Sequence, residues 1–263
     1  MGKSSSLSEY WRLLELAEDY LRDGTRRPHP ALVPPRTARR QEPASRSAAP
    51  SIQLAGLDKS AGVERTAGAV PIAGIDLDAG ASLADIAARV SGCTRCALHR
   101  GRKQAVPGEG AANPRVLVVG EGPGAEEDAT GRPFVGPAGQ LLDRMLKAIE
   151  LDRAANCFIA NVVKCRPPGN RDPLPEESAA CLPYLRAQIA ALRPQAILAV
   201  GRVAAQTLTG LTVGVGEMRR RQLSYEGIPL AVTYHPSAVL RDSSLKRPVW
   251  EDLKRLKSTL GDA

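Results

Sequence analysis

Apolar and polar positions alternate regularly from residue 82 to the end of the chain. Short, nearly continuous apolar runs follow one another, and a longer amphipathic stretch separates each run from the next. Continuous apolar runs are typical of strands that are buried on both faces of a parallel sheet. Four such strands are expected, at RVLVVG, NCFIANVVKC, QAILAVG and IPLAVTYHP (115–120, 156–165, 195–201 and 228–236). The pattern predicts an α/β fold of three layers, α/β/α, with a central four-stranded parallel sheet.

The segments between these strands carry apolar residues at helical spacing. Helices are expected at 82–93, 136–150, 175–193, 203–210 and 247–261. Pro175 stands at the first position of one helix, where its missing N–H costs nothing, and Gly210 closes another. Strands and helices therefore alternate along the chain, as the connections of a parallel sheet require.

The first 81 residues follow a different pattern. Residues 7–22 repeat apolar side chains at helical spacing and predict an amphipathic helix within an N-terminal segment, 1–24. Residues 25–81 are rich in Pro, Ala, Arg, Ser and Gly, a composition that predicts a disordered linker. A folded domain is expected at 82–263. The N-terminal helix is expected either to bind a protein partner or to have no specific role.

The charge of the chain bears on its partners. The chain has 36 Lys and Arg residues and 28 Asp and Glu residues, which gives a formal net charge of +8 and a pI of about 9.5. This balance favours a polyanionic partner, and nucleic acid before a membrane. A solvated basic face is an equally good interpretation of charge alone. The basic residues gather at 219–221 and again between 241 and 257.

Apolar run lengths and cysteine content indicate where the protein works. No apolar run is long enough to span a bilayer, and the first residues lack the apolar core of a secretory signal. The five cysteines are an odd number, and two of them form a Cys-x-x-Cys pair. These features favour a reducing, intracellular compartment without a disulfide framework. We expect a cytoplasmic, nucleoid-associated monomer that contacts no membrane.

Four of the cysteines have the spacing of a metal centre. Cys93 and Cys96 form the close pair, and Cys165 and Cys181 follow as two distant single thiols. Such a set can hold an iron–sulfur cluster or, with the same four thiolates, a zinc ion. The fifth cysteine, Cys157, lies within an apolar run and is expected to be a buried core residue.

Glycine and polar residues gather near the ends of the predicted strands. GEGPG (120–124) follows the first strand, Asn161 lies in the second, and His235 lies at the end of the fourth. Ligands of parallel sheets bind beyond the carboxyl ends of the strands, so a site is expected at this edge. The glycine-rich turn fits neither a phosphate-binding loop nor a dinucleotide fingerprint. Phe134 lies in a loop, where it could be a stacking platform or could simply cap its own loop.

Taken together, these motifs carry a family resemblance. GEGPGAEED with GRPFVGPAGQLL, NVVKCRPPGNRDP, YHPSAVLR and the four spaced cysteines resemble the family-4 uracil-DNA glycosylases, over about residues 83–260. The resemblance implies a DNA-repair enzyme that flips deoxyuridine out of DNA and hydrolyses the N-glycosidic bond, releasing uracil and leaving an abasic site. It also implies a [4Fe–4S] cluster on the cysteines, with a structural task.

The resemblance assigns roles to three side chains around the base. Phe134 matches the stacking position, and Asn161 matches the residue that reads the uracil edge. An amide can donate to O4 and accept from the N3 hydrogen, whereas cytosine would leave both groups unpaired. His235 matches a donor at uracil O2, where negative charge develops as the base departs. A neutral imidazole is sufficient for this role, because one ring nitrogen still donates.

Other residues of the first loop also match the site. Gly120, Glu121 and Gly122 are expected to line the base, and Glu121 is expected to help place the attacking water. A related glycosylase family carries Asp where this chain has Gly122, so that general base is missing here. Glu127 is expected to bound the C5 edge of uracil and exclude thymine, or alternatively to act as a charge at a helix N-terminus.

The resemblance also implies contacts with DNA. Leu240 is expected to be the wedge that fills the space of the flipped base, with a core contact as the alternative. Ser237, Arg241 and the run Arg219, Arg220 and Arg221 are expected to hold phosphates. Two other functions would use the same features: a non-catalytic nucleic-acid-binding protein that retains fold and cluster, and a zinc-ribbon-like interaction protein.

Overall fold

The computed structural model describes residues 81–261. The predictions for the N-terminal helix (1–24) and for all but the last residue of the linker (25–81) lie outside the described residues. The first described helix, α2 (Leu83–Ser91), begins where the pattern predicts. Ser82 caps it through a reciprocal pair of hydrogen bonds with Asp85, which satisfies backbone N–H groups that a helix start leaves free.

One mixed sheet lies at the centre of the described residues. Its strands are β1 (Glu109–Gly110), β2 (Val116–Gly120), β3 (Cys157–Asn161), β4 (Ala196–Val200), β5 (Leu223–Tyr225) and β6 (Ile228–Thr233). Their order across the sheet is β1-β3-β2-β4-β6-β5. The four predicted strands β3, β2, β4 and β6 are parallel to one another, which confirms the predicted core of the sheet. The structure adds β1 and β5, which pair antiparallel at the two edges.

The second edge strand is joined to the sheet by a tight hairpin. β5 and β6 are linked through Glu226 and Gly227, which both have positive φ, at 49° and 85°. Two successive residues with positive φ match the twist of a two-residue hairpin loop. The three-residue strand β5 is too short to show an alternating pattern, so the hydrophobic pattern did not predict it.

Helices account for most of the remaining chain. The long helices predicted from the pattern are present as α4 (Pro137–Lys147), α5 (Pro175–Leu192), α6 (Arg202–Thr209) and α9 (Lys246–Leu260). Short helices that the pattern did not predict are α3 (Ala125–Thr130), α7 (Val215–Met218) and α8 (Pro236–Arg241). Among the described residues, no helix is both long and apolar enough to cross a membrane.

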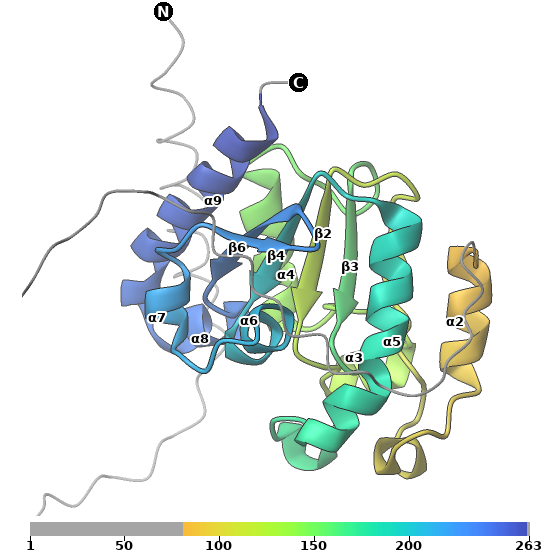
Figure 1. Cartoon of the computed structure of the whole chain (residues 1–263). Coiled ribbons are helices and arrows are strands. Elements are labelled where there is room, and N and C mark those ends of the chain that lie inside the picture. Colours follow the sequence, from red (N-terminus) through yellow and green to blue (C-terminus); the bar gives the residue numbers. More distant parts are fainter. Residues whose placement is uncertain (1–80, 262–263) are drawn as a thin grey trace, which may run out of the picture. The chain divides into compact units, whose positions relative to one another are not determined.

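Both faces of the sheet are covered, as Figure 1 shows. Leu117 and Val119 of β2 face a cluster of buried residues with α2, α5, α6 and α7. Val116 and Val118 face the opposite cluster with α4, α8 and α9. Because successive side chains of a strand point to opposite faces, the continuous apolar runs serve both clusters at once. The predicted three-layer arrangement is confirmed, and Cys157 is fully buried in the core as expected.

Candidate active site and cysteine centre

The carboxyl ends of β2 and β3 place two predicted residues side by side. Gly120 and Asn161 are paired in register at the ends of these strands. A Cβ atom on Gly120 would lie 2.5 Å from the Phe134 ring and closer still to Asn161 Oδ1. A side chain at this position would therefore displace the ring or the amide. The glycine lets Asn161 and Phe134 approach the same point, and we call Gly120, Glu121, Phe134, Asn161 and His235 the strand-end cluster.

Asn161 brings an unsatisfied polar atom to this cluster. The residue is 1% exposed, and its Oδ1 atom has no hydrogen-bond partner among the described residues. Leaving a buried acceptor unpaired costs on the order of 1–3 kcal/mol, so such groups call for an explanation. A ligand that donates a hydrogen bond to Oδ1 would supply the missing partner.

The ring of Phe134 is held in a strained loop beside this amide. Phe134 is 6% exposed, and its ring centroid lies 5.7 Å from that of His235 with the planes tilted by 32°. Its φ of 52° lies in the left-handed region that non-glycine residues rarely adopt. Strain of this kind persists only where surrounding contacts enforce it, and it clusters at functional sites.

Glu127 enforces the loop from one side. Its carboxylate accepts hydrogen bonds from the backbone N–H groups of Val135 and Gly136, at 2.9 and 3.1 Å, and from that of Gly124 at 3.0 Å. This carboxylate thus accepts hydrogen bonds from three backbone donors. It joins the start of α3 to residues 131–136, which we call the Phe134 loop. These contacts support the helix-terminus alternative for Glu127 rather than the predicted contact with the C5 edge of uracil.

Arg153 enforces the loop from the other side. Its guanidinium donates to the carbonyl oxygens of Pro133 and Phe134, both at 2.8 Å, and forms ion pairs with Glu109 and Asp143. The arginine is 15% exposed, so these bonds are partly shielded from water. The sequence analysis missed Arg153, because it lies outside every motif and nothing nearby in the sequence marks its partners.

His235 is fixed as a neutral donor. Its Nδ1 atom accepts a hydrogen bond from the Ser237 N–H at 3.1 Å and lies 2.8 Å from the Ser237 hydroxyl. Since an amide N–H can only donate, Nδ1 is the acceptor and the ring proton is on Nε2. Burial and, to a smaller extent, the charge of Arg241 lower the pKa of His235 to about 4, although Glu127 opposes the shift. The N–H and hydroxyl of Ser237 are both directed at the imidazole, so its predicted phosphate contact is not supported.

Glu121 follows β2 directly and is partly buried. Burial and, to a smaller extent, the charge of Asp172 raise the pKa of Glu121 to about 7, although Arg202 opposes the shift. Asp172 and Arg202 form an ion pair with each other. Next to Glu121, a Cβ on Gly122 would lie 2.8 Å from the Val163 side chain, so an Asp at this position would need Val163 to move. Glu121 is the titratable carboxyl group of the strand-end cluster.

The predicted DNA-contact residues do not share one environment. Arg241 is exposed, whereas Leu240 is half-buried and packs against the cluster with α4 and α9, as its core-contact alternative describes. Arg219 is 7% exposed, pairs with buried Asp252 at 2.8 Å, and donates to the Pro248 carbonyl oxygen. The prediction that Arg219 contacts a phosphate was therefore wrong, because the buried carboxylate of Asp252 already pairs with its guanidinium.

The other two arginines of this run lie at the surface. Arg220 and Arg221 are exposed, and Arg221 forms an ion pair with Glu217. Both border a cavity of about 670 Å³ that residues of β5, β6 and α9 also line. Arg220 therefore presents its charge at the surface, whereas the charge of Arg221 is paired with Glu217.

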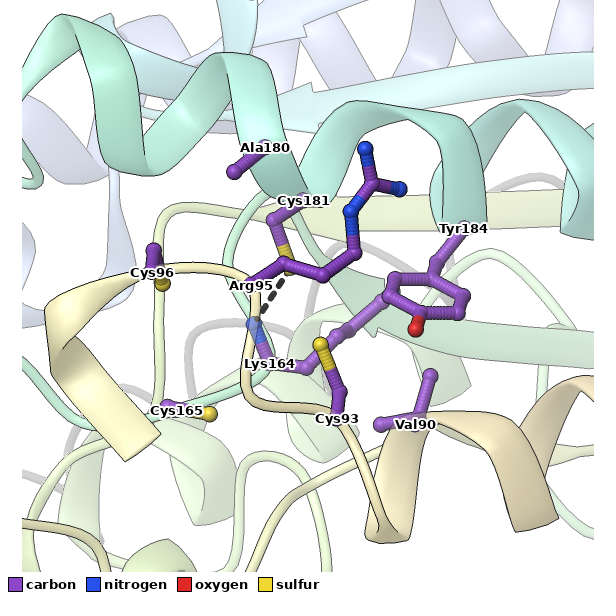
Figure 2. Close-up of a pocket in the computed structure, with 9 residues that line it drawn as sticks. All are labelled: Val90, Cys93, Arg95, Cys96, Lys164, Cys165, Ala180, Cys181 and Tyr184. Atoms are coloured by element: carbon purple, nitrogen blue, oxygen red, sulfur yellow. Dashed lines mark hydrogen bonds between the residues drawn. The ribbon is translucent and has the colours of Figure 1, made fainter. Parts of the chain in front are cut away.

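The four spaced cysteines meet at one cavity. They come from the segment before the first 3-10 turn (Ala97–Arg100), from the loop after β3 and from α5. Figure 2 shows the sulfur atoms of Cys93, Cys165 and Cys181 directed toward a common space, with Cys96 at its edge. β3 ends at Asn161, so Cys165 lies in the loop and does not end the strand as predicted.

The surroundings of these cysteines fit an anionic, thiolate-bound group. Arg102 donates to Cys165 Sγ at 3.2 Å, and the backbone N–H of Lys164 donates to Cys181 Sγ at 3.3 Å. Burial by itself favours the neutral thiol of Cys181, whose pKa it raises to about 12, whereas Lys164 favours the thiolate. Among the described residues, no three His, Cys, Asp or Glu side chains form a compact site for a single metal ion.

Comparisons with known proteins show to which family the chain belongs. Residues 107–254 match the family model of the uracil DNA glycosylase superfamily. A type-4 uracil-DNA glycosylase of Pyrobaculum aerophilum is 46% identical over 174 residues, which cover 62% of this chain and 87% of the relative. Those of Thermotoga maritima (45% over 177 residues, 66% and 92%) and Archaeoglobus fulgidus (39% over 188 residues, 68% and 94%) are also similar. The chain belongs to the type-4 uracil-DNA glycosylases of the uracil-DNA glycosylase superfamily.

Proposed function

We propose that this DNA-repair enzyme excises uracil by means of the strand-end cluster. Membership of the family makes it a hydrolase of N-glycosyl bonds, with uracil-containing DNA as its substrate. The observation that carries the residue roles is the unpartnered Oδ1 of Asn161, which lies next to the Phe134 ring and is buried. An extruded uracil would donate its N3 hydrogen to this oxygen while its face stacks on the ring.

His235 then stabilises the departing base. When the bond between C1′ of the sugar and N1 of uracil breaks, the bonding electron pair goes to the base and places negative charge on O2. The Nε2–H of the neutral imidazole donates to this oxygen more strongly as the charge grows, so it favours the transition state over the substrate. The bond from Ser237 holds the ring in the tautomer that this role needs.

Water completes the hydrolysis at the sugar. Its oxygen forms the new bond to C1′, and it gives up a proton as it does so. With a pKa near 7, Glu121 is ionised in a large fraction of molecules at neutral pH, so its carboxylate can orient the water and accept this proton. Arg241 and Arg220, which are exposed, would contact phosphates of the DNA backbone.

We also propose that Cys93, Cys96, Cys165 and Cys181 hold a [4Fe–4S] cluster. Their shared cavity and the hydrogen-bond donors from Arg102 and Lys164 support this assignment. When bound, the cluster would cross-link the Cys-x-x-Cys segment to α5 and to the loop after β3, whose strand carries Asn161.

The residue roles are tested by measuring release of free uracil from oligonucleotides with one deoxyuridine, single-stranded or opposite guanine. Asn161→Ala and His235→Ala should each lower kcat/KM by about 10²-fold or more, since each removes a bond to the base. Lys257→Met, on the exposed face of α9, serves as the control and should cleave at the parent rate. Parent-like rates in both site variants would refute the roles, and a parent that binds DNA without releasing uracil would favour the non-catalytic alternative.

A further inference from the structure

Among the described residues that are less than 2% exposed, Lys164 has the largest side chain. It lies between the end of β3 and Cys165. Its ammonium donates to the Asn161 carbonyl oxygen at 2.9 Å and to Gln188 Oε1, on α5, at 2.6 Å. Both acceptors are neutral, so neither compensates the charge. Burying an ammonium ion without negative charge nearby costs several kcal/mol.

The missing negative charge can come from Cys93, Cys96, Cys165 and Cys181, which we call the cysteine centre. Lys164 lines the cavity that the four cysteines share, and Figure 2 shows its backbone nitrogen beside Cys181 while its side chain runs on behind the Tyr184 ring. Its own backbone N–H is bonded to Cys181 Sγ, which the dashed line in Figure 2 marks. Metal-ligating cysteines are thiolates, and four of them bring more negative charge than the iron–sulfide core of a [4Fe–4S] cluster offsets. A buried cation beside them is therefore stabilised only when that group is present.

The same side chain reaches the proposed uracil-reading residue. The bond from Nζ to the Asn161 carbonyl closes a turn at the point where the chain leaves β3. Gln188 steadies the ammonium and donates in turn to the Pro107 carbonyl oxygen. On the other side, the N–H groups of Val162 and Val163 are bonded to the carbonyl oxygens of Gly120 and Glu121. The backbone that orients the Asn161 amide is thus held by β2 and by Lys164.

We infer that Lys164 is the internal counter-ion of the thiolate-bound centre and, through the Asn161 carbonyl, a positioning residue for uracil recognition. The second half of this inference rests on the proposed role of Asn161, whereas the first half does not. Loss of the lysine should therefore speed the release of iron and also weaken the binding of the base. Lys164 itself contacts neither the substrate nor the reacting atoms.

The test uses the protein purified with its iron, as the parent, Lys164→Met and the surface control Lys257→Met. Methionine keeps the length of the lysine stem and removes the charge. We expect Lys164→Met to lose iron to a chelator at least 10-fold faster than the parent, followed by visible absorbance and iron content. We also expect its KM for a deoxyuridine oligonucleotide to rise at least 5-fold, with a smaller change in kcat, because Asn161 binds the base before the reaction. Lys257→Met should match the parent in both.

A second variant keeps the inference testable should Lys164→Met not fold. Gln188→Glu is isosteric and leaves the lysine in place, but it gives the ammonium a carboxylate partner and adds negative charge beside the thiolates. It should release iron several-fold faster than the parent. Iron retention or KM at the parent value in a folded Lys164→Met, or parent-like iron retention in Gln188→Glu, would overturn the inference. A parent that releases no uracil would refute the proposed function instead, and the iron measurements would still decide the counter-ion role.

Discussion

At the scale of single residues, the chemical state of each group in the strand-end cluster is set by its immediate contacts. Ser237 makes His235 a donor at Nε2, and burial keeps its imidazole neutral, with a pKa of about 4. Burial and Asp172 act on Glu121 in the opposite sense and raise its pKa to about 7. Two titratable groups whose environments shift their pKa values in opposite directions are typical of a site in which the two groups have different roles, here a neutral hydrogen-bond donor and a base.

The first residue-scale prediction concerns the pH dependence of excision. The active form of Glu121 is the carboxylate, so kcat/KM should rise with pH and level off above about 7. Because His235 titrates near 4, no break should appear near 6.5. In Glu121→Gln the rise should disappear, and the rate at pH 8 should fall by about 10–100-fold. Initial rates of uracil release between pH 5 and 9 check both points, and an unchanged profile in the variant would exclude Glu121 as the base.

The second prediction concerns stability and follows from the same shift. The pKa of Glu121 is higher in the folded protein than its ordinary value of 4.5, so folding favours the protonated form. Stability due to this group is present below pH 4.5 and is lost as the pH rises through about 7. Glu121→Gln should therefore raise the free energy of unfolding at pH 8 by about 1 kcal/mol, discounted for partial exposure, with little change at low pH. Denaturant titrations at pH 5 and pH 8 measure the difference.

The third prediction tests the close approach at Gly120. In Gly120→Ala the new methyl group would meet the Phe134 ring and the Asn161 amide. We expect kcat/KM for uracil release to fall by about 10²-fold, since displacements near 1 Å can cost this much. The matched control is Gly214→Ala, whose added Cβ would have no atom within 4 Å, and it should keep the parent rate. Equal activity in the two variants would show that Phe134 and Asn161 need not converge.

At the scale of elements, the Phe134 loop between α3 and α4 is held by two charged residues of opposite sign. Glu127 takes the backbone donors of the loop, and Arg153 takes its carbonyl acceptors. Gly139, in the first turn of α4, completes the arrangement, because a Cβ there would collide with the Phe134 carbonyl. The Phe134 loop is therefore ordered by α3 and α4 and by Arg153, which follows α4. These contacts hold Phe134 in a backbone conformation that the loop would not adopt alone.

A fourth prediction follows for Arg153. Arg153→Met keeps much of the stem and removes the two bonds to the loop carbonyls, so Phe134 should leave its left-handed conformation. Uracil release should fall by about 10–100-fold, and thermal unfolding should occur at a lower temperature by an amount equivalent to about 1–3 kcal/mol. Arg132→Met, which removes an exposed partner of Glu109, is the control and should change stability by less than about 1 kcal/mol. Full activity in Arg153→Met would show that the loop holds its shape unaided.

At the scale of the whole domain, the cysteine centre joins elements that are distant in the sequence. It connects the segment at 93–96 with the loop after β3 and with α5, and α2 packs on the same face of the sheet. The strand-end cluster lies at the end of that same β3 strand. Integrity of the cysteine centre should therefore affect the stability of the domain more directly than the chemistry of excision.

A fifth prediction compares two buried cysteines. Cys181→Ser should lower the iron content of the purified protein and the temperature of unfolding, because serine is a poor ligand for iron. Cys157→Ala removes an equally buried sulfur from the opposite core and should keep full iron content, at a cost of about 1 kcal/mol in stability. Iron and sulfide determinations with thermal unfolding separate the two, and equal iron in both variants would remove Cys181 from the ligand set.

The sequence by itself determined the features that depend on neighbours along the chain. The four parallel strands, the long helices between them and the placement of Asn161 and His235 at strand ends all follow from local periodicity, which burial on one or two faces imposes. Glu127, by contrast, was recognised as a site residue but given a contact that the structure does not support, because two of its three backbone partners lie in a loop eight and nine residues away.

Only the tertiary structure decided which distant groups meet. The inward turn of Arg219 onto Asp252, the bonds of Arg153 to the Phe134 loop and the burial of Lys164 beside the cysteine cavity each join segments that no local pattern connects. From sequence alone, a charged side chain is expected to be exposed, because its burial depends on a partner that only folding brings close. That is why the strands and the cysteines could be found in advance, while the residues that hold them in working geometry could not.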